Sequence, residues 1–217
     1  MSRFAAVIFD MDGVLVDGEP LHFQAVNQLM GEEGKAITLD QYKPYMGTKA
    51  GWTEMIRDFG LVQPYEYYGP RYRDLILRQY CDCSEPLPGA VELVQALSRA
   101  RVPIAVASSS ILPWVEACFG RIGLAAAFDV IVSGSDVTEG KPDPEIYLLA
   151  AARLGVAPAD CLAIEDAPAG ILSAKNAGMT CWAVRTEYTR DLDLGNPDRV
   201  LESLVDVDLA GLVGVPA

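Results

Sequence analysis

Two pairs of carboxylic acids stand directly after apolar segments of the chain: Asp10 and Asp12 near the start, and Glu165 and Asp166 further on. Residues two apart in an extended chain can project to the same side. Carboxylates gathered at ~4 Å repel one another by about 4 kcal/mol per pair in a protein-like dielectric. Four of them can therefore share a site only if a cation joins them or some are protonated.

Polar groups of complementary kinds follow two other segments. Ser108 and Ser109 come after an apolar run, and Lys141 lies in the sequence Gly-Lys-Pro-Asp-Pro. Each feature alone would be explained as a turn or a helix cap. A hydroxyl and backbone N–H groups at a helix start can hold phosphate oxygens, however, and lysine adds a fixed positive charge. Together with the acids they indicate phosphoryl transfer, with a carboxylate nucleophile and an oxygen-ligated Mg²⁺ ion.

Apolar segments that alternate with helical patterns have to position these groups. The predicted strands are 4–9, 103–107, 130–132, 162–164 and 181–184. The predicted helices of the same region are 89–99, 112–122, 144–154 and 169–177. This alternation predicts an α/β fold, a Rossmann-like parallel sheet with helices on both faces. Ligands of such sheets bind beyond the carboxyl ends of the strands, which is where the polar groups stand.

A helical stretch separates the first predicted strand from the others. Residues 21–80 show helical patterns and no convincing strand, and the segment 83–88, Cys-Ser-Glu-Pro-Leu-Pro, is typical of a linker. We therefore expect an inserted α-helical domain at 17–84. The α/β core domain would comprise 1–16 and 85–217.

Composition restricts the partners of this chain. It has 30 acidic and 17 basic side chains and a net charge of −13, which argues against nucleic acid or an anionic membrane as a partner. No apolar run approaches a membrane span or a signal peptide, so we expect a cytoplasmic protein. The five cysteines include no Cys-x-x-Cys pair and are expected to be reduced. The charge raises the question of how this chain would hold an anionic substrate.

Four segments, in order, resemble the motifs of the haloacid dehalogenase superfamily. They are Phe9-Asp10-Met11-Asp12-Gly13-Val14-Leu15-Val16-Asp17, Ala105-Val106-Ala107-Ser108, Lys141-Pro142-Asp143-Pro144, and Ile164-Glu165-Asp166-Ala167-Pro168-Ala169-Gly170-Ile171. The combination is specific and spans almost the whole chain. The helical insert after the first motif resembles the α-helical cap of the β-phosphoglucomutase-like branch.

The resemblance implies a role for each motif residue. Asp10 would attack phosphorus and form an aspartyl-phosphate. Asp12 would protonate the leaving alcohol and then activate the hydrolytic water. Ser108, Ser109 and Lys141 would hold the transferring phosphoryl group, and Lys141 would also orient Asp10.

The resemblance also implies the metal site and the type of substrate. Mg²⁺ would be held by Asp10, the main-chain carbonyl of Asp12, Asp166 and Glu165. Family members that act on carbon–halogen or carbon–phosphorus bonds lack an acid at the position of Asp12, because they need no proton for an alkoxide leaving group. A small-molecule phosphate ester is therefore the expected substrate.

Residues of the insert are candidates for substrate recognition. His22 and Gly47 match positions seen in phosphoglucomutase-like members, although a histidine on a helix surface or at an interface is an equally good interpretation of His22. The mutases have a lysine before this glycine and a Ser-Arg pair after it, whereas here Met46 precedes it and Lys49-Ala50 follows. Lys49 could partly substitute for the missing cations.

These departures favour a Mg²⁺-dependent phosphatase acting on a small phosphorylated metabolite, such as a sugar or polyol phosphate. The alternative within the family is a β-phosphoglucomutase-like sugar phosphate isomerase. A phospho-accepting signalling receiver gathers similar residues, but receivers are shorter and lack an inserted helical domain. Five aromatic residues of the insert could line a sugar pocket or form its core: Trp52, Tyr65, Tyr67, Tyr68 and Tyr72.

Overall fold

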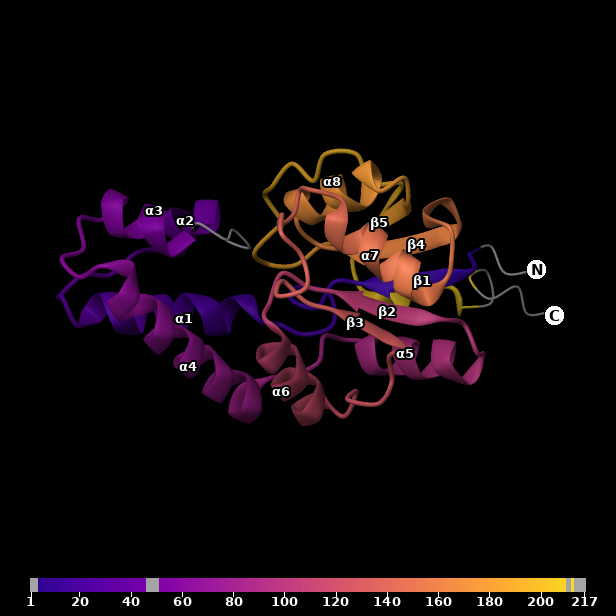
Figure 1. Ribbon diagram of the computed structural model, residues 1–217, viewed down its shortest axis with the longest axis horizontal. Coiled ribbons are helices and arrows are strands. Elements are labelled where there is room, and N and C mark those ends of the chain that lie inside the picture. Colours follow the sequence, from indigo (N-terminus) through magenta and orange to yellow (C-terminus); the bar gives the residue numbers. More distant parts are fainter. Residues whose placement is uncertain (1–3, 46–50, 210–211, 213–217) are drawn as a thin grey trace.

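The computed structural model describes residues 4–45, 51–209 and 212. Figure 1 shows a parallel sheet with helices on both sides, and a group of helices that extends from one end of it. The predicted α/β fold with a helical insert is confirmed. Among the described helices, none combines the length and the apolar character that crossing a bilayer requires.

Over the described residues the sheet contains six strands, all paired in parallel, in the order β3-β2-β1-β4-β5-β6. Their bounds are β1 (Ala6–Phe9), β2 (Ile104–Ala107), β3 (Val130–Val132), β4 (Cys161–Glu165), β5 (Thr180–Val184) and β6 (Arg199–Leu201). Strand β1 lies between β2 and β4, so the strand order reverses beside it. A crevice for a ligand is expected at the carboxyl end of β1, where Asp10 follows.

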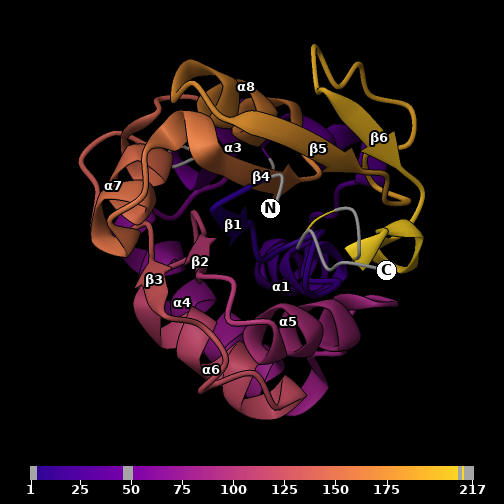
Figure 2. The same ribbon diagram turned by 90° about the vertical axis from the view of Figure 1, so that its right-hand side faces the viewer.

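Helices cover both faces of the sheet, which is why its central strands are continuous apolar runs. Val7 and Phe9 of β1 belong to the core shared with α5 (Ala90–Arg99) and α6 (Leu112–Ile122). Ile8 faces the opposite core, with α7 (Glu145–Leu154) and α8 (Pro168–Asn176). Figure 2, turned by 90° about the vertical axis from Figure 1, shows these two helical layers with the sheet between them.

The helical insert has a hydrophobic core of its own. It contains α1 (Glu19–Gly31), α2 (Leu39–Tyr42), a 3₁₀ turn (Lys43–Tyr45), α3 (Gly51–Asp58) and α4 (Tyr65–Cys83). Leu29, Met55 and Tyr68 are buried together inside it. Helix α4 also packs against α6, so one side of the insert rests on the α/β part.

Two chain segments connect the insert to the sheet, and they contact each other. Val16 forms a bridge with Pro86, and the Leu87 N–H donates to the Leu15 carbonyl at 3.0 Å. The contact lies beside the predicted domain limits at 16/17 and 84/85, which stay a prediction.

The structure differs from the expected elements at a few places. Strand β6 was not expected, because three residues are too few to show an alternating pattern; in the structure two of its side chains are exposed. The four-residue helix α2 is too short to show a periodic pattern. Helix α4 continues to Cys83, into the segment expected to be a linker. The five cysteines form no disulfide with one another in this structure, and three of them are buried.

The loop after β3, which carries Lys141, is fastened by Asp136. The Asp136 Oδ2 atom accepts hydrogen bonds from the Ser133 N–H (2.9 Å) and the Ser133 hydroxyl (2.7 Å). Arg153 of α7 donates to Oδ1 at 2.8 Å. These donors lower the pKa of Asp136 to about 2, from its ordinary value of 3.8.

We expect Asp136→Ala to lower the free energy of unfolding by about 1–3 kcal/mol, because it removes hydrogen bonds to a charged acceptor. Because the folded-state pKa is depressed, this stabilisation is fully present above the unfolded pKa and is lost as pH falls through about 2. Urea titrations should show a constant difference from wild type above about pH 5 and a shrinking one below about pH 4. Asp40→Ala, which removes the ion pair of the highly exposed Asp40 with the half-buried Lys43, is the control and should change stability by less than about 0.5 kcal/mol.

Candidate active site

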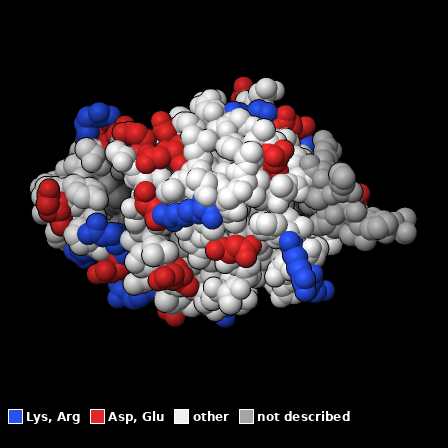
Figure 3. Space-filling model, turned by 45° about the vertical axis from the view of Figure 1, so that its right-hand side comes forward, with Lys and Arg blue, Asp and Glu red and all other residues white. Residues whose placement is uncertain are grey.

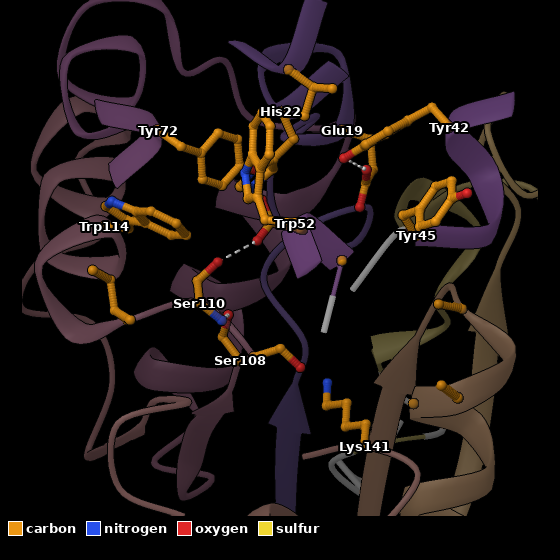
Figure 4. A pocket seen from close by; sticks show the side chains of 18 of the residues that line it. Glu19, His22, Tyr42, Tyr45, Trp52, Tyr72, Ser108, Ser110, Trp114 and Lys141 are labelled. Carbon is orange, nitrogen blue, oxygen red and sulfur yellow. Dashed lines mark hydrogen bonds between the residues drawn. The ribbon is translucent and has the colours of Figure 1, made fainter. Parts of the chain in front are cut away.

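A cavity of about 330 Å³ lies between the carboxyl ends of the central strands and the helical insert. Figure 4 shows Ser108 and Lys141 on the side of the sheet, with aromatic side chains of the insert on the opposite side. All the motif residues that were expected to act on phosphate line it: Asp10, Asp12, Ser108, Ser109, Lys141, Glu165 and Asp166. The structure thus brings the four motifs to one place.

Lys141 joins two of the carboxylates. Its Nζ lies 2.7 Å from Asp10 Oδ1 and 2.5 Å from Glu165 Oε1, and its side chain is only 7% exposed. The Tyr147 hydroxyl also donates to Glu165 Oε1, at 2.6 Å. Burial acts to lower the pKa of Lys141, but the two carboxylates outweigh it and raise that pKa, so the ammonium stays charged.

One ammonium group does not balance three buried carboxyl groups. Asp10, Glu165 and Asp166 each offer an oxygen, and these oxygens lie within 4.8 Å of one another. Burial raises the pKa of Asp10 to about 7, against the opposing effect of Lys141. Burial and the charges of Glu165 and Asp10 also raise the pKa of Asp166. A group of buried oxygens short of positive charge, without sulfur or nitrogen donors, suits a hard divalent cation such as Mg²⁺.

Two glycines provide the space for these carboxylates. A Cβ atom on Gly13, whose φ is +78°, would lie 2.1 Å from Asp166 Oδ2. A Cβ atom on Gly170 would lie 2.0 Å from Glu165 Oε1. Any side chain at either position would push a carboxylate out of the group.

The side chain of Asp12 lies apart from this carboxylate group. Its Oδ1 accepts a hydrogen bond from the Tyr80 hydroxyl at 2.5 Å, and its Oδ2 accepts one from the Ser110 hydroxyl at 3.0 Å. The expected convergence of four carboxylates is thus limited here to three, Asp10, Glu165 and Asp166. The expected metal contact of Asp12 through its main-chain carbonyl stays a prediction.

The serines follow β2 and precede α6. Ser108 is buried, its N–H donates to the Val132 carbonyl at 3.0 Å, and its hydroxyl oxygen accepts from the Ser110 N–H at 3.1 Å. Ser109 is exposed and lines the cavity. Their position at a strand end directly before a helix is the one at which backbone N–H groups can face an anion.

Of the candidate substrate-binding residues of the insert, the structure describes only His22. His22 is buried and lines the cavity, but Tyr72 and Tyr80 already contact its two ring nitrogens, at 2.6 and 2.8 Å. Its expected role in substrate binding stays a prediction. Gly47 and Lys49 lie outside the described residues.

Aromatic residues divide between the cavity and the core of the insert. Trp52, Tyr65 and Tyr72 line the cavity. The hydroxyls of Tyr67 and Tyr68 instead donate hydrogen bonds to the carboxylates of Glu32 and Glu33, respectively.

Sequence reasoning did not single out Glu19, Tyr80 or Trp114 as parts of this site. Glu19 lines the cavity, and burial together with the charge of Asp12 raises its pKa to about 8. Its place three residues before His22 was a signal that could have identified it. Tyr80 and Trp114 occupy ordinary positions of helical patterns, so nothing local distinguishes them from core residues.

Comparison with known proteins identifies the family of this chain. The family model for haloacid dehalogenase-like hydrolases matches residues 4–178. The chain belongs to this family. It is 36% identical over 178 residues to the phosphorylated carbohydrates phosphatase of Thermotoga maritima, covering 80% of this chain and 82% of that protein. It is 33% identical to the fructose-1-phosphate phosphatase YqaB of Escherichia coli, covering 84% and 97%.

Solved structures of the family resemble the whole chain. CbbY from Rhodobacter sphaeroides in complex with phosphate superimposes with a TM-score of 0.87 at 30% identity, covering 96% of this chain and 99% of that one. A mutant of the same CbbY has been solved with xylulose-1,5-bisphosphate bound. Within the haloacid dehalogenase-like hydrolases, this chain is a phosphoric monoester hydrolase.

Gly170→Ala should lower the activity of this haloacid dehalogenase-like enzyme, because the new methyl group would displace the Glu165 carboxylate from Lys141. We expect phosphatase activity to fall roughly 10- to 100-fold, as for other residues that orient a site. Gly120→Ala is the matched control, since it is also a helical glycine but nothing lies within 4 Å of its added Cβ. It should retain activity and gain up to about 1 kcal/mol of stability. Equal activity of the two variants would contradict the expected crowding at Glu165.

Proposed function

We propose that the protein is a Mg²⁺-dependent phosphatase that hydrolyses a small phosphorylated metabolite, a sugar or polyol phosphate, through an aspartyl-phosphate intermediate. The observation that carries the proposal is the buried contact of Asp10 with Lys141 beside Glu165 and Asp166. It combines a carboxylate nucleophile, a fixed cation and oxygen ligands for a metal in one cavity.

In the first step, an oxygen of Asp10 attacks phosphorus and the bond from phosphorus to the substrate oxygen breaks. Ser108, Ser109 and Lys141 hold the phosphoryl oxygens, and Asp12 gives its proton to the departing alcohol. Mg²⁺ would be held by Asp10, Glu165, Asp166 and the Asp12 carbonyl, and it would supply positive charge beside the phosphoryl group.

In the second step, water attacks the aspartyl-phosphate. The bond between Asp10 and phosphorus breaks, inorganic phosphate leaves, and the proton of the attacking water passes to Asp12. The same side chain thus serves first as an acid and then as a base, which returns the enzyme to its starting protonation state.

The organic part of the substrate is expected to lie against the insert. Trp52 and Tyr72 line this part of the cavity, and their ring centroids are 5.5 Å apart. The ring centroid of Trp114, on α6, lies 5.9 Å from that of Tyr72. Aromatic rings offer apolar faces against which the C–H face of a sugar can pack. The cavity volume suits a small metabolite, and relatives named above act on or bind sugar phosphates.

The charge of −13 does not conflict with an anionic substrate, because phosphate binding depends on local charge. Among the described residues of the face in Figure 3, acidic and basic side chains are interspersed and the basic ones form no continuous patch. Inside the cavity, Lys141 and the expected Mg²⁺ would turn a site that repels anions into one that binds them. We also propose that the partner is a small molecule and not nucleic acid or a membrane, and that the protein is cytoplasmic.

The direct test is turnover of a panel of phosphorylated metabolites with Mg²⁺. We expect release of inorganic phosphate from sugar or polyol phosphates, its loss in excess EDTA, and its recovery when Mg²⁺ is restored. Asp10→Asn should lower turnover by more than about 10³-fold, since it removes the nucleophile and leaves the shape unchanged. Turnover that survives this substitution or persists in EDTA would refute the mechanism.

A second assay separates hydrolysis from isomerisation. With a hexose 1-phosphate, Mg²⁺ and a bisphosphate primer, we expect inorganic phosphate to form and hexose 6-phosphate not to accumulate. The reason is that the mutase cations beside Gly47 are replaced by Met46 and Ala50. Accumulation of the 6-phosphate in excess of free phosphate would establish the β-phosphoglucomutase-like alternative instead.

A further inference from the structure

A row of side chains ends on the carboxylate of Asp12. The Tyr72 hydroxyl lies 2.6 Å from His22 Nδ1, His22 Nε2 lies 2.8 Å from the Tyr80 hydroxyl, and that hydroxyl lies 2.5 Å from Asp12 Oδ1. His22 and Tyr80 are buried. No step of the proposed reaction uses Tyr80, so its contact with Asp12 calls for an explanation.

The direction of each hydrogen bond follows from the end of the row. The Tyr80 hydroxyl donates its single proton to Asp12 Oδ1, which can accept it both in the carboxylate and in a carboxylic acid that carries its proton on Oδ2. Its oxygen must then accept from His22, which places the proton of a neutral imidazole on Nε2. Nδ1 is left as the acceptor for Tyr72. Burial lowers the pKa of His22, which agrees with a neutral ring.

The row crosses from the insert to the α/β part. Tyr80 belongs to α4 and Asp12 to the loop after β1, 68 residues away. Gly18 makes the contact possible, since a Cβ atom there would lie 1.8 Å from Asp12 Oδ1 and 3.0 Å from the Tyr80 hydroxyl. The insert therefore reaches into the site through one phenol.

We propose that Tyr80 is a positioning residue for Asp12: by donating to Oδ1 it orients the carboxyl group so that Oδ2 exchanges the proton with the leaving alcohol and the attacking water. The inference rests on the function proposed above. Ser110, which contacts Oδ2, is compatible with both states of Asp12, because a hydroxyl can donate to a carboxylate and accept from a carboxylic acid. Tyr80 stays a donor to Oδ1 throughout.

p-Nitrophenyl phosphate provides a test, because its leaving group needs no proton whereas the attack of water still needs Asp12 as a base. Rapid-mixing experiments with Tyr80→Phe should show an unimpaired first release of p-nitrophenol. Steady-state kcat should then fall roughly 10- to 100-fold while KM does not rise. On an alkyl phosphate, whose leaving group does need the proton, the first turnover should slow as well.

Tyr68→Phe is the matched control. Tyr68 is a buried tyrosine of the same helix, and its hydroxyl also donates to a carboxylate, that of Glu33, but it does not line the cavity. This variant should share any loss of stability and keep wild-type kinetics. A second comparison uses Asp12→Ala: if Tyr80 acts only through Asp12, adding Tyr80→Phe to it should cause no further loss of steady-state turnover.

Several results would overturn the inference. Wild-type kinetics or a higher kcat in Tyr80→Phe would show that the phenol does not hold Asp12 in a productive position. Equal slowing of both phases, or an additive loss in the double variant, would indicate a purely structural role. A wild-type enzyme without turnover of either substrate would instead refute the proposed phosphatase function, and this inference with it.

Discussion

The site depends on one buried ammonium group among three buried carboxyl groups. Lys141 Nζ contacts Asp10 and Glu165, which follow or end the neighbouring strands β1 and β4. Taking charges out of water is costly unless they are paired, and a single lysine leaves this group short of positive charge. The imbalance is what makes a divalent cation a reasonable further partner, and what would let an acidic protein accept a phosphate.

Other features of the fold allow Lys141 and the three carboxyl groups to lie close together. The reversal of strand order beside β1 puts the ends of β2 and β4 on either side of Asp10. Gly13 and Gly170 allow the carboxylates to approach the backbone closely. The loop that carries Lys141 is long, but Asp136 fastens its start to Ser133 and Arg153. Together these features allow the charged groups of the site to lie close to one another.

The helical insert contributes a different kind of surface to the same cavity. The carboxyl ends of the strands contribute carboxylates, hydroxyls and Lys141, whereas the insert contributes most of the aromatic side chains together with Glu19 and Arg73. This arrangement would suit a substrate with an anionic end and a carbon skeleton. The insert also reaches Asp12 through Tyr80, so the proposed acid and base has one partner from each part of the chain. Proton transfer and substrate enclosure would then depend on the same interface.

The sequence by itself determined which residues lie at the carboxyl ends of the strands. Each of them ends or follows an apolar run, or lies in a loop after one, and parallel strands must bring these ends together. They are Asp10, Ser108, Lys141, Glu165 and Asp166. The sequence could not determine β6, whose three residues lack a pattern, or the partners of Asp12. Tyr80 is 68 residues from Asp12 in the chain, and a helical pattern shows which face is buried without showing against what. Only the packing of α4 on the α/β part decided that contact, because helix packing depends on side chains from segments that no local pattern relates.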